Sequence, residues 1–424
     1  MLAVLGVSDA RAPLIQPDAI RTPLALMRAQ SATRATAPGA DGVSWAEFAA
    51  NLPRHAGTQR RLLLEGQRSN ALRNPRAEGA AAGTPGTAPT HWTLAAPGGL
   101  SHSTLGRTVL GGVEGVLLRL QGTTAAGQAN LFLEAPGAVA AATGQPWTAG
   151  VFLAVVAGTL PAGAHEISLG LLELDAGGAT LASGFGASVT ASLGAVPQRV
   201  LRSATLAQVG TQSVRPCLRI ATLETGVVVD VTLFIGWPTL EQAALASTPV
   251  LPAPGSVATS TRGAEIVTAP FATLFPSGRG TVLCRGLLRG LGGGGVSYPW
   301  LLQIDDGGNV NRVAVLGTEF GYLRMVRTSA GASVQVDATG NPIAPGTPFS
   351  FGLAFEANGR LALSVNGGVP QVLSGAPMAS LTTLRLGNSP GLTTPAFAEI
   401  STLQVRPVAI SDASLPGTVL ALPG

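Results

Sequence analysis

The stretch Phe351–Gly368, FGLAFEANGRLALSVNGG, decides the fold class. Its apolar residues alternate with small or polar ones on both sides of Asn358–Gly359, and Asn-Gly between alternating runs is a strong signal for a β-hairpin. The two apolar series on either side of this turn are Phe351, Leu353 and Phe355, and then Leu361, Leu363 and Val365. The pattern predicts two antiparallel strands that present matching faces to one core.

Short alternating runs separated by turn residues continue through most of the 424 residues, which are rich in Gly (56) and Pro (31). Turn signals recur about every ten residues, which is typical of sandwiches and jelly rolls. Hydrophobic residues make up 46% of the chain and charged residues 11%, so there is ample material for a core. We therefore expect an all-β protein with two tandem antiparallel β-sandwich (jelly-roll) domains behind a short irregular N-terminal segment.

The domain boundaries follow the prolines and glycines that interrupt the strand pattern. One short helix is expected at Ser44–Asn51, where Ser44 and Glu47 have the spacing of a capping box. The expected parts are an N-terminal segment at 1–72, a first sandwich at 73–253, a linker at 254–261 and a second sandwich at 262–424.

The charge pattern excludes several classes of protein. The formal charge is +4 and the arginines are scattered, whereas nucleic-acid binding needs a dense basic face. No run of 18 apolar residues is free of breaks, so membrane insertion is not expected. The N-terminus lacks the features of a signal peptide. Cys217 and Cys284 are too far apart in sequence to indicate a disulfide framework or a metal site.

The parts of a metabolic enzyme are missing from the sequence. The four histidines lack metal-ligand spacing, there is no nucleophile motif, and Gly290–Gly295 lacks the Lys-Ser/Thr of a phosphate loop. Asp305 and Asp306 are adjacent, so on a strand they point to opposite faces and make a poor acid–base pair. They form either a turn before Gly307 or, with Asn309, an oxygen-ligand site for Ca²⁺. No other cofactor is expected, and a polysaccharide depolymerase is disfavoured.

Aromatic and planar polar side chains are the residues that bind sugars, because sugar rings stack on aromatic faces. Trp147 begins a strand of the first sandwich, where it is either a ligand or part of the core. Arg324 either contacts acidic sugars or belongs to a solvated face. The candidate glycan-binding residues are Tyr298, Trp300, Tyr322, Arg324 and Trp147.

The first part of the chain resembles phage and prophage fibre proteins whose sandwich is similar to carbohydrate-binding modules. RRLLLEGQRSNALRNP is similar to the segment that begins their first sandwich, and FIGWPTLEQAALASTPVLP is similar to its last strand. Three shorter landmarks fit the same order: ALMRAQSATRA at Ala25–Ala35, NLPRH at Asn51–His55 and TRGAEIVT at Thr261–Thr268.

The C-terminal part resembles a laminin-G or concanavalin-like sandwich. Besides the hairpin, LRLGNSPG at Leu384–Gly391 and VRPVAISDASL at Val405–Leu415 are similar to strands of such domains, although the aromatic residue usual before the closing Arg is absent. Some laminin-G folds bind Ca²⁺.

These resemblances imply a fibre or spike subunit on a virion or phage-like particle, made in the bacterial cytoplasm without a signal peptide. Its expected partners are a cell-surface polysaccharide, other particle proteins that bind residues 1–72, and further copies of itself in a trimer. The alternative is a purely structural fibre or decoration protein without a glycan site.

Overall fold

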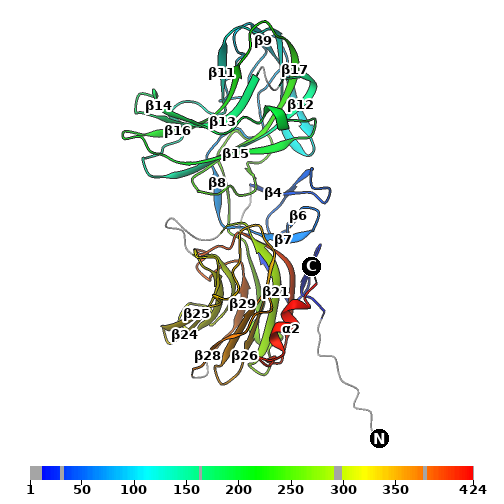
Figure 1. Cartoon of the computed structure of the whole chain (residues 1–424), viewed down its shortest axis with the longest axis vertical. Helices are drawn as coiled ribbons and strands as arrows, with labels where there is room; N and C mark the ends of the chain where they lie inside the picture. Colours follow the sequence, from blue (N-terminus) through cyan, green and yellow to red (C-terminus); the bar gives the residue numbers. More distant parts are fainter. Residues whose placement is uncertain (1–11, 29–32, 162–164, 291–297, 376–379, 424) are drawn as a thin grey trace. The chain divides into compact units, whose positions relative to one another are not determined.

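The computed structural model describes residues 12–28, 33–161, 165–290, 298–375 and 380–423 (Figure 1). The chain forms two compact units, each built from separate stretches of sequence. Unit 1 comprises Met1–Ala29, Ala50–Gln67 and Gly263–Gly424, and unit 2 comprises Gln30–Ala49 and Arg68–Arg262. Nearly all regular structure is antiparallel β-sheet, which confirms the predicted all-β class.

Unit 2 is a sandwich of a five-stranded and a four-stranded sheet. The first has the order β15-β12-β17-β10-β9, with β9 (Leu100–Leu110), β10 (Val113–Thr123), β12 (Pro146–Thr159), β15 (Gln198–Thr205) and β17 (Val228–Glu241). The second has the order β11-β16-β13-β14, with β11 (Gly127–Phe132), β13 (His165–Leu174), β14 (Thr180–Phe185) and β16 (Ser213–Thr222). Alternate residues such as Val116, Leu118 and Leu120 of β10 are buried in one apolar core, as strand periodicity requires.

A hairpin covers part of the outer face of the five-stranded sheet in unit 2. Strands β4 (Arg34–Pro38) and β5 (Trp45–Phe48) pair with each other, and β4 also pairs with β18 (Val250–Leu251). The Trp45 ring meets Phe152 of β12 edge-on at 5.1 Å, and Phe152 in turn meets Trp237 at 6.0 Å. This cluster lies on the opposite side of β12 from the main core.

The helix predicted at Ser44–Asn51 is wrong, because β5 occupies this stretch. The Asp41 carboxylate accepts hydrogen bonds from the backbone N–H of Val43 and of Ser44 and from the Ser44 hydroxyl, which closes a turn instead of a helix cap. Glu47 binds Arg76 rather than the backbone of Ser44. Tertiary pairing therefore overrides the local capping signal.

Unit 1 is a second sandwich, with a nine-stranded and a seven-stranded sheet. The main path of the larger sheet is β2-β1-β30-β21-β26-β27-β28, with β1 (Ile15–Gln16), β2 (Ala19–Ile20), β21 (Gly280–Leu288), β26 (Phe349–Phe355), β27 (Leu361–Val365), β28 (Gln371–Leu373) and β30 (Ala398–Arg406). The smaller sheet has the order β25-β24-β23-β22-β29-β20-β3, with β20 (Ile266–Pro270), β22 (Trp300–Asp305), β23 (Arg312–Gly317), β24 (Leu323–Ser329), β25 (Ala332–Asp337) and β29 (Thr383–Leu386).

The predicted hairpin of unit 1 and its matching apolar faces are confirmed. Phe351 pairs with Val365, Leu353 with Leu363 and Phe355 with Leu361 across the turn. All six side chains lie in the core of unit 1. The short helix α1 (Phe271–Leu274) also faces this core, whereas α2 (Leu415–Leu420) packs on the outer face of the larger sheet (Figure 1).

The N-terminal segment does not form a separate irregular piece, because its described strands join both units. Strands β1 (Ile15–Gln16) and β7 (Arg61–Leu64) pair with β30, β3 (Ala25–Met27) pairs with β20, and β8 (Arg68–Asn70) pairs with β19 (Ser260–Arg262). The remaining short strands are β2 (Ala19–Ile20) and β6 (His55–Ala56). None of the helices among the described residues has the length and hydropathy of a membrane span.

Candidate functional site

Three of the predicted glycan-binding residues meet on one face of the seven-stranded sheet. Trp300 of β22 is in register with Leu316 of β23, which is in register with Arg324 of β24. Tyr298 packs against the small cluster around Trp300, which is separate from the core of unit 1. We call the residues Tyr298, Trp300, Arg312 and Arg324 the Tyr298 patch.

Two guanidinium groups lie against the two rings of the Tyr298 patch. Arg324 lies 5.5 Å from the centroid of the Tyr298 ring, and Arg312 lies 4.6 Å from that of the Trp300 ring. Arg324 also forms a bidentate ion pair with Asp337 of β25, at 2.6 and 2.9 Å, and this hydrogen bonding raises the pKa of Arg324. Burial lowers the pKa of Arg312.

Tyr298, Arg312 and Arg324 are partly exposed, whereas Trp300 is only 8% exposed. Tyr322 ends the turn that follows β23, where its carbonyl accepts a hydrogen bond from the Thr318 backbone N–H at 2.8 Å. In the same turn Phe320 is 70% exposed, a residue that the sequence did not single out. Its position between Glu319 and Gly321, outside any apolar run, is the sequence feature that could have indicated its exposure.

Trp147 lies elsewhere, in the core of unit 2, where it is 4% exposed. Its indole N–H donates to the Gln145 side chain at 3.3 Å. Of the two readings that the sequence left open for Trp147, the structure therefore favours the core.

The expected calcium ligands are already bound to other side chains. Asp305 is fully buried and pairs with Arg385 at 2.7 Å. Asn309 accepts a hydrogen bond from Arg312 at 2.7 Å. The Asp306 carboxylate accepts hydrogen bonds from the Gly308 backbone and the Asn311 amide, and these bonds lower its pKa.

The cationic charge beside Asp305 and Asn309 is thus supplied by guanidinium groups. Within the part of the chain that the structure describes, no three His, Cys, Asp or Glu residues are placed to hold a metal ion. The geometry of Asp305, Asp306 and Asn309 gives no support to the predicted calcium site.

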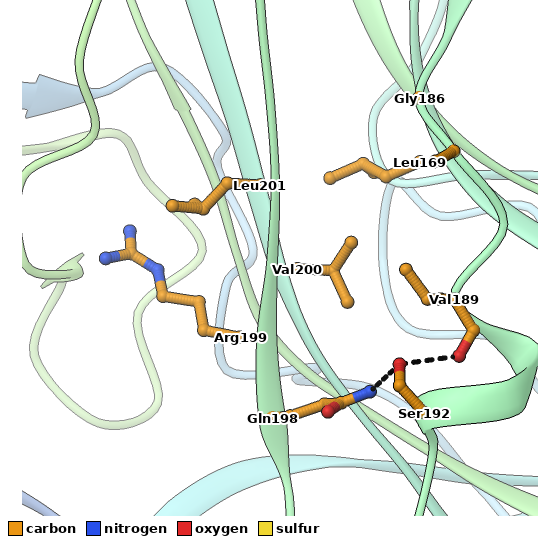
Figure 2. A pocket seen from close by; sticks show the side chains of 9 residues that line it. Leu169, Gly186, Val189, Ser192, Gln198, Arg199, Val200 and Leu201 are labelled. Carbon is orange, nitrogen blue, oxygen red and sulfur yellow. Dashed lines mark hydrogen bonds between the residues drawn. The ribbon is translucent and has the colours of Figure 1, made fainter.

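A groove in unit 2 was not predicted from sequence. It consists of two adjoining hollows of about 320 and 490 Å³ that share Ser192, Gln198 and Arg199. The first hollow lies between β15 and the segment 186–192, which follows β14 (Figure 2). The second is bounded by Gly42, Val43 and Trp45 of the N-terminal hairpin and by residues 194–197.

Alternation along β15 divides the side chains that line the first hollow. Figure 2 shows Val200 and Gln198 on the side of Val189 and Leu169, with Arg199 and Leu201 on the other side of the strand. Gln198 donates to the Ser192 hydroxyl at 3.0 Å, and this hydroxyl donates to the Val189 carbonyl at 2.9 Å. Ser192 belongs to the 3-10 turn η1 (Thr190–Ser192).

The landmarks that resemble fibre proteins form buried polar clusters and not an exposed site. In unit 1, Arg28, Arg54, Glu65 and Glu265 come from four separate landmarks and are all fully buried. Glu265 binds Arg28 at 2.6 Å and Arg54 at 2.9 Å, and it also accepts a hydrogen bond from the Glu65 backbone at 2.9 Å.

A comparable buried residue in unit 2 is Asn70. Its amide donates to the Pro238 carbonyl at 3.1 Å, and its side-chain oxygen accepts from the backbone N–H groups of Leu72 and Leu240 at 3.1 and 2.9 Å. These landmarks therefore fix strands to each other.

Comparisons with known proteins give weak similarity. No family model matches the chain, and no curated protein matches it. A carbohydrate-binding module of a Ruminococcus gnavus sialidase, bound to alpha2,3 sialyllactose, is 18% identical, with 33% of this chain and 82% of that chain covered and a TM-score of 0.28.

Two further solved structures have similar scores. A heptameric SAP-like pentraxin from Limulus polyphemus is 15% identical, with coverage of 33% and 69% and a TM-score of 0.27. The receptor binding domain of botulinum neurotoxin type G is 8% identical, with coverage of 36% and 39% and a TM-score of 0.28. Similarity at this level carries no argument about what this chain binds.

Proposed function

We propose that this chain is a non-enzymatic fibre or spike subunit on the surface of a virion or phage-like particle, and that it binds bacterial surface glycans through the Tyr298 patch. The observation that carries the proposal is the meeting of Tyr298 and Arg324 on an outer sheet face. An aromatic ring beside a planar, multiply donating group is the combination that sugar recognition uses.

The two outer faces of unit 1 differ in a way that supports this choice. The nine-stranded sheet is covered in part by α2, through Leu415 and Val419 packed on Leu283. No described helix packs on the outer face of the seven-stranded sheet, where the Tyr298 patch lies. Tyr298 and Arg324 are both partly exposed on this face, so a ligand can contact them.

The proposal is tested with purified host polysaccharides and the variants Tyr298→Ala and Arg324→Gln. Each is expected to weaken binding about tenfold, since one aromatic or charge-assisted contact contributes about 1 to 1.5 kcal/mol. Val372→Ala, on β28 in the other sheet, is the matched control because Val372 is also partly exposed. Unchanged binding by both patch variants, with unchanged melting temperatures, would contradict the proposal.

The alternative, a purely structural fibre or decoration protein, is favoured by a different observation. Arg324 is already paired with Asp337, and Trp300 is buried under Arg312. Much of the hydrogen-bonding and stacking capacity of the patch is therefore used within the protein. Absence of binding to every host glycan, together with tight retention on the particle, would establish this alternative. Shortening of the polymer on incubation would instead indicate a depolymerase.

Particle docking through residues 1–72 and assembly as a trimer belong to the same proposal. Because strands β1, β3 and β7 are built into unit 1, docking would use the surfaces that these strands leave exposed or residues 1–11, which lie outside the described residues. Light scattering that gives a monomeric mass would count against the trimer.

A further inference from the structure

We propose that the groove of unit 2 is a second saccharide site and that it selects sugars carrying an N-acetyl group. The site is independent of the Tyr298 patch, since all of its lining residues belong to unit 2. The inference rests on three features of the groove: an apolar slot, a polar edge beside it and a partly exposed tryptophan.

The apolar slot lies between β15, an edge strand of the five-stranded sheet, and the segment that follows β14, an edge strand of the four-stranded sheet. Leu169 of β13, Val189 and Val200 line it, and Leu169 also belongs to the core (Figure 2). Arg202 of β15 spans the opening next to the slot and donates to the Gly184 carbonyl at 3.2 Å. A slot with aliphatic walls takes a methyl group rather than a hydroxyl, because an unpaired hydroxyl there would lose its hydrogen bonds to water.

The polar edge consists of the Gln198 carboxamide and the Ser192 hydroxyl, which lie 3.0 Å apart. A carboxamide offers both donors and an acceptor, and these complement the C=O and N–H of an acetamido group. Because Gln198 lies next to the apolar wall formed by Val200, one acetamido group would place its methyl in the slot and its amide against Gln198.

The adjoining hollow supplies a surface for the sugar ring. Trp45 is partly exposed, and its edge-on contact with Phe152 at 5.1 Å holds the indole in place. Pro197 lines the same hollow. Among the residues that line the two hollows Arg199 is the one charged group, and it donates to the Ser247 carbonyl at 2.6 Å. The groove therefore accepts neutral or acidic saccharides.

The test compares matched saccharides by calorimetry and by saturation transfer to the ligand methyl group. The ligands are chitotriose and the methyl glycosides of N-acetylglucosamine, N-acetylgalactosamine and N-acetylmannosamine, each against its counterpart with a hydroxyl in place of the acetamido group. We expect at least one acetamido ligand to bind about tenfold more tightly than its counterpart, since one methyl group in an apolar pocket discriminates by about that factor.

Two variants assign this preference to the groove. We expect two variants to abolish the preference: Ala187→Trp, at an exposed residue that lines the slot, and Gln198→Ala. The control Thr205→Ala, at an exposed position farther along β15, is expected to keep it. Tyr298→Ala tests the other unit and is expected to leave the preference unchanged. The inference is overturned if no acetamido ligand is preferred, or if the preference survives both groove variants or is lost in Tyr298→Ala.

Discussion

Replacing Glu265 by glutamine should reveal how far unit 1 depends on its buried charges. Glu265 is fully buried and accepts hydrogen bonds from two arginines, Arg28 and Arg54, as well as from the Glu65 backbone. Burial works against the charge on Arg54, but Glu265 and Glu65 outweigh it and raise its pKa. Burial lowers the pKa of Arg28 despite Glu265.

In Glu265→Gln the shape of the side chain is kept, but the buried guanidinium groups of Arg28 and Arg54 both lose the Glu265 carboxylate, while Glu65 still pairs with Arg54. Removing one partner from a buried ion pair costs about 3 to 5 kcal/mol. We therefore expect the free energy of unfolding of unit 1 to fall by about that amount. The matched control is Asp18→Asn, which breaks the exposed pair between Asp18 and Arg60 and should cost less than about 1 kcal/mol.

Hydrogen exchange read by mass spectrometry resolves the two units in the intact chain. We expect the slowest amides of β21 and β30 to exchange by global unfolding of unit 1, so their protection should fall roughly 150- to 4,500-fold in Glu265→Gln. Amides of β10 and β17 in unit 2 serve as the internal reference. Protection in unit 1 that stays within a factor of five of the wild type would refute the argument that the cluster stabilises it.

Three further predictions concern the same chain. Removing residues 1–67 should prevent unit 1 from folding, because β1 and β7 pair with β30; limited proteolysis that leaves 263–424 intact would contradict this. Burial lowers the pKa of His165 and outweighs the Pro161 backbone and Glu224, which both act to raise it. Protons then bind the unfolded chain more tightly, so unit 2 should have its full stability above about pH 6.5 and lose some of it as the pH falls. Urea titrations at pH 7.5 and 5 should show a smaller difference in His165→Leu, and an equal difference would contradict the assignment. Burial raises the pKa of both Cys217 and Cys284 to about 12, so a disulfide reagent should label neither thiol until urea unfolds the chain.

Local patterns in the sequence predict the fold well where strands are long and joined by tight turns. The faces of the hairpin around Asn358–Gly359 are predicted correctly, because alternation places Phe351, Leu353 and Phe355 on the same side as Leu361, Leu363 and Val365. The helix expected at Ser44–Asn51 fails because a capping box is a local signal. The partners that decide this stretch, β4 and Phe152, lie outside that window.

The candidate sites also differ in how far local sequence patterns could predict them. Trp300 and Arg324 could be named as candidates because aromatic and planar polar side chains bind sugars, but their shared sheet face depends on the pairing of β22, β23 and β24 and was not predicted. The groove could not be predicted, since it joins residues near 42–45, 186–192 and 194–201 that are mostly small and have no shared spacing. Likewise, no periodicity in the sequence indicates that Arg28, Arg54, Glu65 and Glu265 meet. Each lies just outside a strand of two to five residues, which is too short for alternation to be recognised.

The division of unit 1 into separate stretches of sequence bears on how the chain folds during translation. Strands β1 and β7 emerge from the ribosome early, yet their shared partner β30 begins only at Ala398. Unit 2, which ends at Arg262, can close while unit 1 is still being synthesised. At roughly 5 to 20 residues per second, the early strands wait on the order of 20 to 70 seconds with unpaired edges. This interval makes synthesis, rather than the folded chain, the stage at which unit 1 is most exposed to aggregation.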